Sequence, residues 1–243
     1  MSLKQAMPIK CIGHRGGGMS AGFAENSLAS IEHGLSLGVD GIEIDVWDCQ
    51  GELLVFHDRR LGRVLSGNEL LLELSPQALK ARARKQGFDL PTLQEVMTLI
   101  GDRAFLNIEI KGPNCAHLVA KTIEAQVIDA QRTYEQYVVS SFDHHQIQNL
   151  LTINERIPRG VLIEGVPLDI IASCKALKAH FLGAGLTYIR QHLIDDSHRI
   201  GTEFWVYTVN HLDDIRHLDA MGVDAVFTDL PQLMMNPELA EVV

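Results

Sequence analysis

Four short segments in the first half of the chain place carboxylates, imidazoles and cations in apolar, β-prone sequence. They read Gly13-His14-Arg15-Gly16-Gly17, Glu43-Ile44-Asp45, His57-Asp58 and Glu109-Ile110-Lys111. A carboxylate in such surroundings is costly to bury unless a cation or hydrogen bonds offset its charge. Three such acids beside an arginine, a lysine and two histidines indicate a metal-assisted site for a phosphate group.

The acids are spaced so that they share strand faces, because side chains alternate along a strand. Glu43 and Asp45 therefore lie on one face. Glu109 and Lys111 share one face of a second strand. Two neighbouring strands of this kind aim three carboxylates at one point, where mutual repulsion raises their pKa values. A hard divalent cation removes that conflict, and we predict one, Mg²⁺ or Ca²⁺, at the three acids. The alternative is a set of buried ion pairs with Arg15 and Lys111.

The two histidines each follow an apolar strand. His14 precedes Arg15 and a run of glycines, which lets backbone amides approach an anion while the guanidinium binds phosphate in a bidentate manner. The alternative for this segment is a plain loop. His57 ends another strand, and two histidines at the same rim suit an acid/base pair that works near neutral pH. Arg59 and Arg60, which follow, are candidates for solvated surface cations.

Other polar and aromatic residues carry weaker signals. His144 and His145 come after a strand and are candidates for the edge of the site. Trp205 and Tyr207 share one face of a late strand, where they form either an apolar wall for an alcohol or part of the core. The remaining histidines, in helical or loop context, are expected to be surface or core residues.

Apolar β-type runs alternate with helical patterns along the chain, which indicates parallel strands covered by helices. About eight such units, with an additional strand at Leu53–His57, favour a TIM (β/α)₈ barrel over a doubly wound open sheet. The segment from Arg59 to Leu90 is predicted to be a small insertion in a single domain that spans residues 1–243. Expected strands lie at 9–13, 41–47, 53–57, 105–111, 137–140, 160–163, 181–184, 204–208 and 225–228, and expected helices begin near 27, 76, 93, 116, 143, 168, 188, 212 and 231.

The composition limits the classes of function. The chain has 243 residues and a formal net charge of −10, which argues against nucleic acid as a partner. Its four cysteines form no C-x-x-C pair and are expected to be reduced, which is compatible with a cytoplasmic protein. Residues 1–7 lack the apolar region of a signal peptide, and no run approaches the roughly 20 apolar residues of a membrane span.

The ordered set of motifs resembles the glycerophosphodiester phosphodiesterases of the cytosolic bacterial type, over nearly the whole chain. Departures from the family pattern are Ala24 in place of a proline, Tyr207 in place of a tryptophan, and the absence of an Arg-Thr-Thr-like pattern after His57-Asp58. The matching segments are His14-Arg15-Gly16, Glu25-Asn26-Ser27, residues 41–46, His57-Asp58, residues 91–95, residues 108–111, residues 207–210 and residues 222–231.

The resemblance implies a TIM barrel that cleaves glycerophosphodiesters to sn-glycerol 3-phosphate and an alcohol. It implies metal ligands at Glu43, Asp45 and Glu109. It implies a general acid and base at His14 and His57. By the same resemblance, the substrate contacts are Arg15, Lys111, Glu25 and Tyr207, with Glu25 also assisting at the metal.

We expect His14 to be the base and His57 the acid, with the reverse order open. The nucleophile is either the glycerol 2-hydroxyl or water. Two other functions compete with this hypothesis: a lysophospholipase D-like or sphingomyelinase D-like lipid phosphodiesterase, which requires an apolar mouth, and a non-catalytic phosphodiester-binding barrel. No amphipathic stretch or basic patch predicts stable membrane association.

Overall fold

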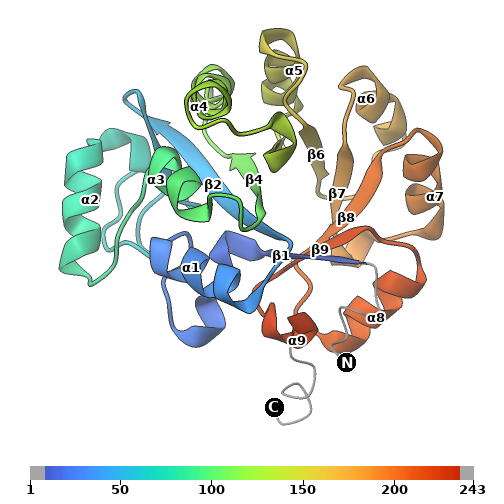
Figure 1. Ribbon diagram of the computed structural model, residues 1–243, viewed down its shortest axis with the longest axis horizontal. Helices are drawn as coiled ribbons and strands as arrows, with labels where there is room; N and C mark the ends of the chain where they lie inside the picture. The colour runs from blue at the N-terminus through green and yellow to red at the C-terminus, as the bar shows by residue number, and fades with distance from the viewer. Residues whose placement is uncertain (1–8, 236–243) are drawn as a thin grey trace.

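The computed structural model describes residues 9–235 and contains the closed parallel barrel that the alternating pattern predicts (Figure 1). Eight parallel strands form the barrel, which closes because β1 pairs with β9 on one side and with β2 on the other. The barrel strands are β1 (Lys10–Gly13), β2 (Gly41–Cys49), β4 (Phe105–Ile110), β5 (Tyr137–Ser141), β6 (Arg159–Ile163), β7 (Phe181–Gly185), β8 (Glu203–Tyr207) and β9 (Ala225–Thr228). The prediction of a TIM barrel is confirmed, and the open sheet is wrong for this chain.

Helices surround the barrel and cover its outer face, apart from the helix of the insertion, which lies to one side (Figure 1). They begin close to the predicted positions, and Thr92 and Glu95 form the capping box that starts α3. The helix expected near Tyr188 begins at Gln191, because residues 186–188 form a separate 3₁₀ turn. The helices are α1 (Leu28–Leu37), α2 (Pro76–Lys85), α3 (Leu93–Ile100), α4 (Ala116–Asp129), α5 (His144–Ile153), α6 (Ile170–Ala176), α7 (Gln191–Arg199), α8 (Leu212–Ala220) and α9 (Gln232–Met235).

The apolar interior occupies two layers. Isoleucines and valines on the outward faces of the strands pack under the helices, as alternation along β2 requires. Inside the barrel, Trp205 stacks on Phe181 with ring centroids 3.8 Å apart, and Phe105 and Phe227 pack around this pair. This aromatic cluster fills the barrel beneath the carboxyl ends of the strands, which are the end where TIM-barrel sites lie. Trp205 is therefore a core residue.

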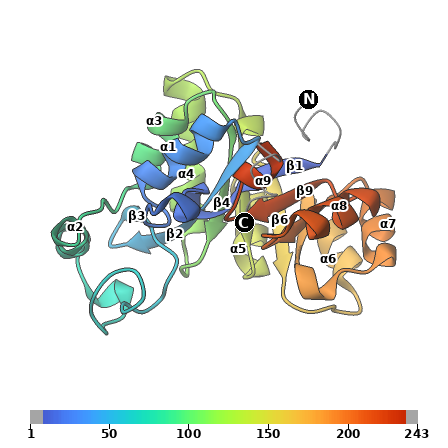
Figure 2. The same ribbon diagram turned by 90° about the horizontal axis from the view of Figure 1, so that it is seen from below.

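The insertion follows an extra strand, β3 (Glu52–Val55), which pairs antiparallel with β2. The strand begins one residue earlier than the predicted Leu53–His57 and ends two residues earlier, although the amide of Phe56 still donates to the carbonyl of Asp45 at 3.0 Å in the same register. Beyond β3 the chain projects to one side of the barrel and carries α2 (Figure 2). Apolar residues of the insertion pack with β2 and β3 in a cluster of their own, composed of Trp47, Cys49, Leu54, Phe56, Leu61, Leu65, Leu71, Leu79, Ala83 and Leu90.

We propose that barrel and insertion form one domain, since the cluster of the insertion is built partly on barrel strand β2. All four cysteines are buried. No helix within residues 9–235 combines the length and the apolar character needed to cross a membrane. The predicted absence of a signal peptide concerns residues 1–7, which lie outside the described residues.

Candidate active site

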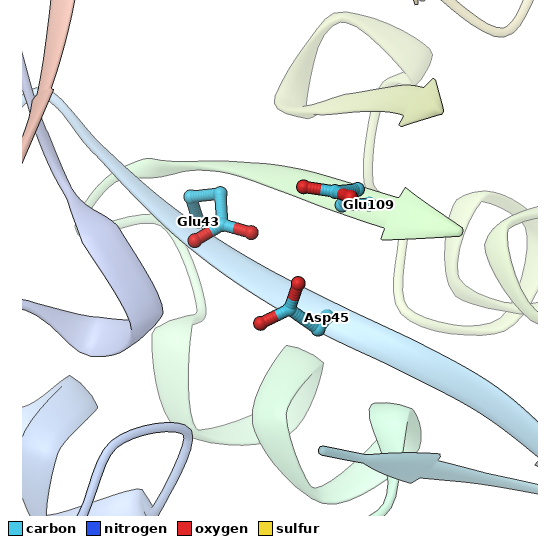
Figure 3. Close-up of side chains that lie close together, drawn as sticks. All are labelled: Glu43, Asp45 and Glu109. Carbon is cyan, nitrogen blue, oxygen red and sulfur yellow. The ribbon is translucent and has the colours of Figure 1, made fainter. Parts of the chain in front are cut away.

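Three carboxylates meet at one point inside the barrel. Glu43 and Asp45 come from β2, Glu109 comes from β4, and the register of these strands places Asp45 beside Glu109. The carboxylates point toward one shared space (Figure 3), and one oxygen from each lies within 4.8 Å of the others. Glu43 and Asp45 are 2% and 1% exposed, so this is a buried concentration of negative charge. The predicted convergence of the three acids is present.

The cluster fits a hard cation. The donors are all oxygen atoms, and within residues 9–235 neither Oε1 of Glu43 nor Oδ1 of the adjacent Asn107 has a hydrogen-bond partner. Burial, followed by the charges of Asp45 and Glu109, raises the pKa of Glu43 well above its ordinary value. Burial and the charge of Asp45 raise the pKa of Glu109 to about 7. The carboxylates thus lack sufficient compensation from the protein alone.

Two cations flank the acids, so the ion pairs considered as the alternative are partly present. The Nζ atom of Lys111 lies 2.7 Å from Oε1 of Glu109 and 3.9 Å from Oδ1 of Asp45. The Nε atom of Arg15 lies 3.6 Å from Oδ2 of Asp45. Burial opposes the charge of Lys111, but Glu109 and Asp45 raise its pKa, so it stays protonated. These pairs leave Oε1 of Glu43 without a partner within residues 9–235.

A tight turn after β1 presents Arg15 to the cluster. Arg15 has a left-handed backbone with φ of 49°, and its amide donates to Oε2 of Glu43 at 2.8 Å. Its carbonyl accepts from the amide of Asn26 at 2.9 Å and from Oγ of Ser30 at 3.1 Å. Gly16 also has a positive φ of 98°, and a Cβ there would lie 2.6 Å from Oγ of Ser30. The glycine run therefore lets the turn pack against α1 while it directs Arg15 to the site.

Each predicted catalytic histidine is held by an aspartate. The Nδ1 atom of His14 lies 2.7 Å from Oδ1 of Asp229, and Nδ1 of His57 lies 2.7 Å from Oδ1 of Asp58. An aspartate on Nδ1 fixes the orientation of the ring and leaves Nε2 to exchange a proton. Nε2 of His14 lies 3.9 Å from Oε2 of Glu43, at the border of the carboxylate cluster. Burial lowers the pKa of His57, although Asp45 and Asp58 act in the opposite direction.

These groups border a cavity of about 210 Å³. Of the predicted site residues, Asp45 and Glu25 are not among those that line it: Asp45 lies deeper, and Glu25 contacts Arg15, whose NH1 donates to it at 3.0 Å. His144 and His145 do not line it either. The lining consists of His14, Arg15, Glu43, His57, Asn107, Glu109, Lys111, Phe142, Leu162, Glu164, Tyr207, Thr208 and Phe227.

A second cavity of about 460 Å³ adjoins the first, since Lys111 lines both. It lies between the insertion and the loop after β4, and Leu72 from the insertion is 41% exposed there. Its lining consists of Trp47, Arg59, Leu70, Leu72, Lys111, Gly112, Pro113 and Asp143. The site thus opens toward a partly apolar groove beside the insertion.

Tyr207 contributes its ring, not its hydroxyl, to the cavity. The hydroxyl donates to the carbonyl of Ile163 at 2.6 Å, and the ring contacts that of Phe142 edge to face at 5.7 Å. The sequence did not decide whether Trp205 and Tyr207 form a wall of the site or part of the core. In the structure, Tyr207 lines the site and Trp205 packs in the core.

The Tyr207→Phe substitution tests this division. We expect kcat/KM to stay close to that of the wild type, because the ring remains, while the free energy of unfolding falls by about 1 kcal/mol through loss of the bond to Ile163. Steady-state kinetics and urea denaturation measure the two quantities. A large loss of kcat/KM in Tyr207→Phe would show that the hydroxyl acts on the substrate.

Four residues of the site network received no role from the sequence. Asn26 bonds Asp45, with Nδ2 2.9 Å from Oδ2, and Asp229 and Asp58 hold the histidines. Asn26, Asp229 and Asp58 stand inside the quoted motifs, so their position in those motifs was an available signal. Arg63 is a surface-type residue in an irregular loop, and only its contacts in the folded chain reveal it.

The family model of the glycerophosphoryl diester phosphodiesterases matches residues 14–233. The chain belongs to this family. Among curated relatives, a glycerophosphodiester phosphodiesterase of Caldanaerobacter subterraneus subsp. tengcongensis is 29% identical over 95% of this chain and 98% of the relative. One of Bacillus altitudinis is 28% identical over 91% of this chain and 95% of its own length. The resemblance seen in the motifs is thereby confirmed.

Solved structures of the phosphodiesterase family share the fold. A phosphodiesterase of Oleispira antarctica, solved with the product sn-glycerol 3-phosphate, has a TM-score of 0.80 at 26% identity and full coverage of both chains. A protein of Galdieria sulphuraria described as a putative glycerophosphodiester phosphodiesterase has a TM-score of 0.83 at 21% identity, over 96% of this chain and 98% of that one. The second likeness concerns the fold alone.

Proposed function

We propose that the protein hydrolyses glycerophosphodiesters to sn-glycerol 3-phosphate and an alcohol. The observation that carries this proposal is the convergence of three carboxylates, two cations and two aspartate-held imidazoles on one cavity. Membership of the family supports it, as does the product bound to the Oleispira antarctica relative. Release of sn-glycerol 3-phosphate from glycerophosphocholine tests it, and a purified, folded enzyme that releases none from this or other glycerophosphodiesters would contradict it.

One divalent cation, Mg²⁺ or Ca²⁺, would be held by Glu43, Asp45 and Glu109. When bound, it supplies a Lewis acid that polarises a phosphoryl oxygen and lowers the pKa of the attacking hydroxyl. Support comes from the oxygen-only donors, the raised pKa values and the unpartnered Oε1 of Glu43 among the described residues.

Arg15 and Lys111 bind the phosphoryl group in this proposal and oppose the negative charge that develops on its oxygens. Glu25 orients Arg15 through their 3.0 Å contact. The ring of Tyr207 forms one wall of the pocket. All of these groups occupy fixed elements or well-bonded turns, so the charges are in position before the substrate arrives.

We assign His14 as the base and His57 as the acid. His14 borders the carboxylate cluster, where an attacking hydroxyl would sit, and takes its proton on Nε2. His57 stands on the side of the insertion and gives a proton to the departing alkoxide. A lowered pKa leaves His57 largely neutral in the free enzyme near pH 7, and the negative charge of a bound phosphodiester restores its protonation. The nucleophile is the glycerol 2-hydroxyl or water.

The competing functions receive less support. The named relatives are glycerophosphodiester phosphodiesterases. A non-catalytic barrel would be expected to have lost an acid or a histidine of the predicted set, whereas this chain contains all of them. The groove beside the insertion is the feature that a lipid substrate would use. We propose a small-molecule substrate, no nucleic-acid partner, no stable membrane association and a cytoplasmic location, in line with the acidic composition.

Cation binding is expected to stabilise the protein more at pH 8 than at pH 5.5. In the cation-free fold the pKa of Glu43 is raised and that of Glu109 is about 7. These two carboxyl groups therefore keep their protons in the folded state at pH values at which they are already ionised in the unfolded state. The free energy of unfolding consequently falls as pH rises from about 4.5 through 7. A cation must displace these protons, so its binding is weaker at low pH. Thermal denaturation with Mg²⁺ or Ca²⁺ against EDTA at both pH values measures the effect, and equal shifts at the two values would contradict it.

A further inference from the structure

Arg63 lies in the insertion, outside the cavity, and contacts two site acids at once. Its NH1 and NH2 atoms each donate to the carboxylate of Glu25 at 2.6 Å. Its Nε and NH2 atoms donate to the two oxygens of Asp58 at 2.9 Å. The guanidinium thus bridges two carboxylates, which only the planar fork of arginine can do with paired bonds.

Both carboxylates hold a predicted substrate or catalytic side chain on their other side. Glu25 accepts from NH1 of Arg15 at 3.0 Å, and Asp58 holds Nδ1 of His57 at 2.7 Å. The chain of contacts runs from Arg15 through Glu25, Arg63 and Asp58 to His57. Its members come from the turn after β1, the loop before α1, the segment just after β3 and the insertion, so Arg63 joins segments that otherwise approach the site separately.

The charges suit this position. The Glu25 side chain is 5% exposed and the Asp58 side chain 16%, so each carboxylate needs a cation or several hydrogen bonds. Burial acts to raise the pKa of Asp58, but the hydrogen bonds from Arg63 and His57 outweigh burial and lower this pKa. The carboxylate therefore stays ionised and able to orient the imidazole. The hydrogen bonds that Arg63 donates to Glu25, against the effect of burial, raise the pKa of Arg63 itself.

We propose that Arg63 is a positioning residue. It fixes the side chains of Arg15 and His57 relative to each other and makes the insertion a structural part of the active site. The guanidinium touches neither the cavity nor the carboxylate cluster. It acts through Glu25 on the phosphate-binding cation and through Asp58 on the ring of the acid. The proposal rests on the proposed function for its kinetic test and on geometry alone for its spectroscopic test.

The kinetic test uses Arg63→Gln, Asp58→Asn and the double variant, assayed on glycerophosphocholine. We expect kcat of Arg63→Gln to fall about 10- to 100-fold, as for a displaced catalytic group. The double variant is expected to lose little beyond the worse single variant, because both changes release the same ring. Fully additive losses would overturn the proposal.

Arg82→Gln is the matched control, since it removes a two-bond arginine–carboxylate pair with Glu69 in the same insertion and away from the cavity. Its kcat is expected to equal that of the wild type. Equal, small losses of kcat in Arg63→Gln and Arg82→Gln would show that Arg63 only stabilises the fold through its ion pairs, and would overturn the proposal. If Arg63→Gln fails to fold, Arg63→Lys keeps the charge without the fork and is expected to fold and still lose kcat; wild-type kcat in Arg63→Lys would overturn the proposal.

Nuclear magnetic resonance of the His57 ring gives a readout that does not require activity. The proton on Nδ1, shared with Asp58, is expected to give a downfield resonance in the wild type that shifts or broadens in Arg63→Gln and stays unchanged in Arg82→Gln. An unchanged His57 resonance in a folded Arg63→Gln protein overturns the proposal. A wild type without phosphodiesterase activity would instead contradict the proposed function and leave this test in force.

Discussion

Chelation of divalent cations with EDTA is expected to abolish hydrolysis of glycerophosphocholine, and excess Mg²⁺ or Ca²⁺ is expected to restore it. Substitution of Glu43 by Gln should reduce kcat on the order of a thousandfold or more, because Lewis-acid stabilisation is worth several kcal/mol and each 1.36 kcal/mol is tenfold in rate. Asp45→Asn and Glu109→Gln should behave alike, since all three carboxylates belong to one cluster. Release of sn-glycerol 3-phosphate measures the effect.

The stability of the same variants separates a cation site from a structural network. In the cation-free protein, Glu43→Gln removes a carboxylate that repels Asp45 and Glu109 and whose own pKa is raised by burial. Above pH 7 the melting temperature of this variant should therefore equal or exceed that of the wild type. The stabilisation by added cation should be largely lost. Glu203→Gln, an acid that pairs with Lys10 at the other end of the barrel, is the control and should keep both activity and the response to cation. Full turnover by protein stripped of divalent ions would end the metal hypothesis.

His57→Ala is expected to lose about 10² to 10⁴ in kcat on glycerophosphocholine, the range for removal of a general acid. The loss should be small on a glycerophospho-p-nitrophenyl ester, because that leaving group departs without a proton. His14→Ala is the matched control: its ring is held by Asp229 in the same way, but a base is needed whichever alcohol leaves. Its loss should therefore be similar on both substrates.

The two histidine variants distinguish the order of proton transfer. Rescue of His57→Ala by the activated ester, without rescue of His14→Ala, assigns the acid to His57. The reverse pattern would assign the acid to His14 and make our assignment wrong. The absence of rescue in both would remove general acid catalysis by either imidazole from the mechanism.

Much of this site follows from local sequence. The spacing of Glu43 and Asp45 on one strand fixes their common face, because alternation is a property of the extended backbone. The same reasoning gave Glu109 and Lys111, and the strand–helix alternation gave the barrel. Once strands are parallel and neighbours in a barrel, their carboxyl ends gather at one mouth, so the three acids had to meet.

The aspartates that hold the two histidines could not be predicted from strand alternation in this way. Asp229 lies 215 residues from His14 in the chain, and it reaches the ring because β9 pairs with β1 when the barrel closes. Only Asp58, adjacent to His57, was near enough in sequence to suggest its role. The role of Tyr207 was also open, because face alternation places Trp205 and Tyr207 alike, whereas depth along the barrel axis separates core from pocket.

The sequence by itself determined the fold class, the identity of the acids, histidines and cations, and the side of each strand on which they lie, since these depend on residue type and on the short-range period of the backbone. Tertiary structure alone decided which groups hold them. An exposed arginine such as Arg63 has no periodic signal, and its bonds to Glu25 and Asp58 exist only because the loop of the insertion that carries it lies against the loop before α1 and the segment after β3. Contacts of this kind depend on how loops close in space, which the local preferences of residues do not specify.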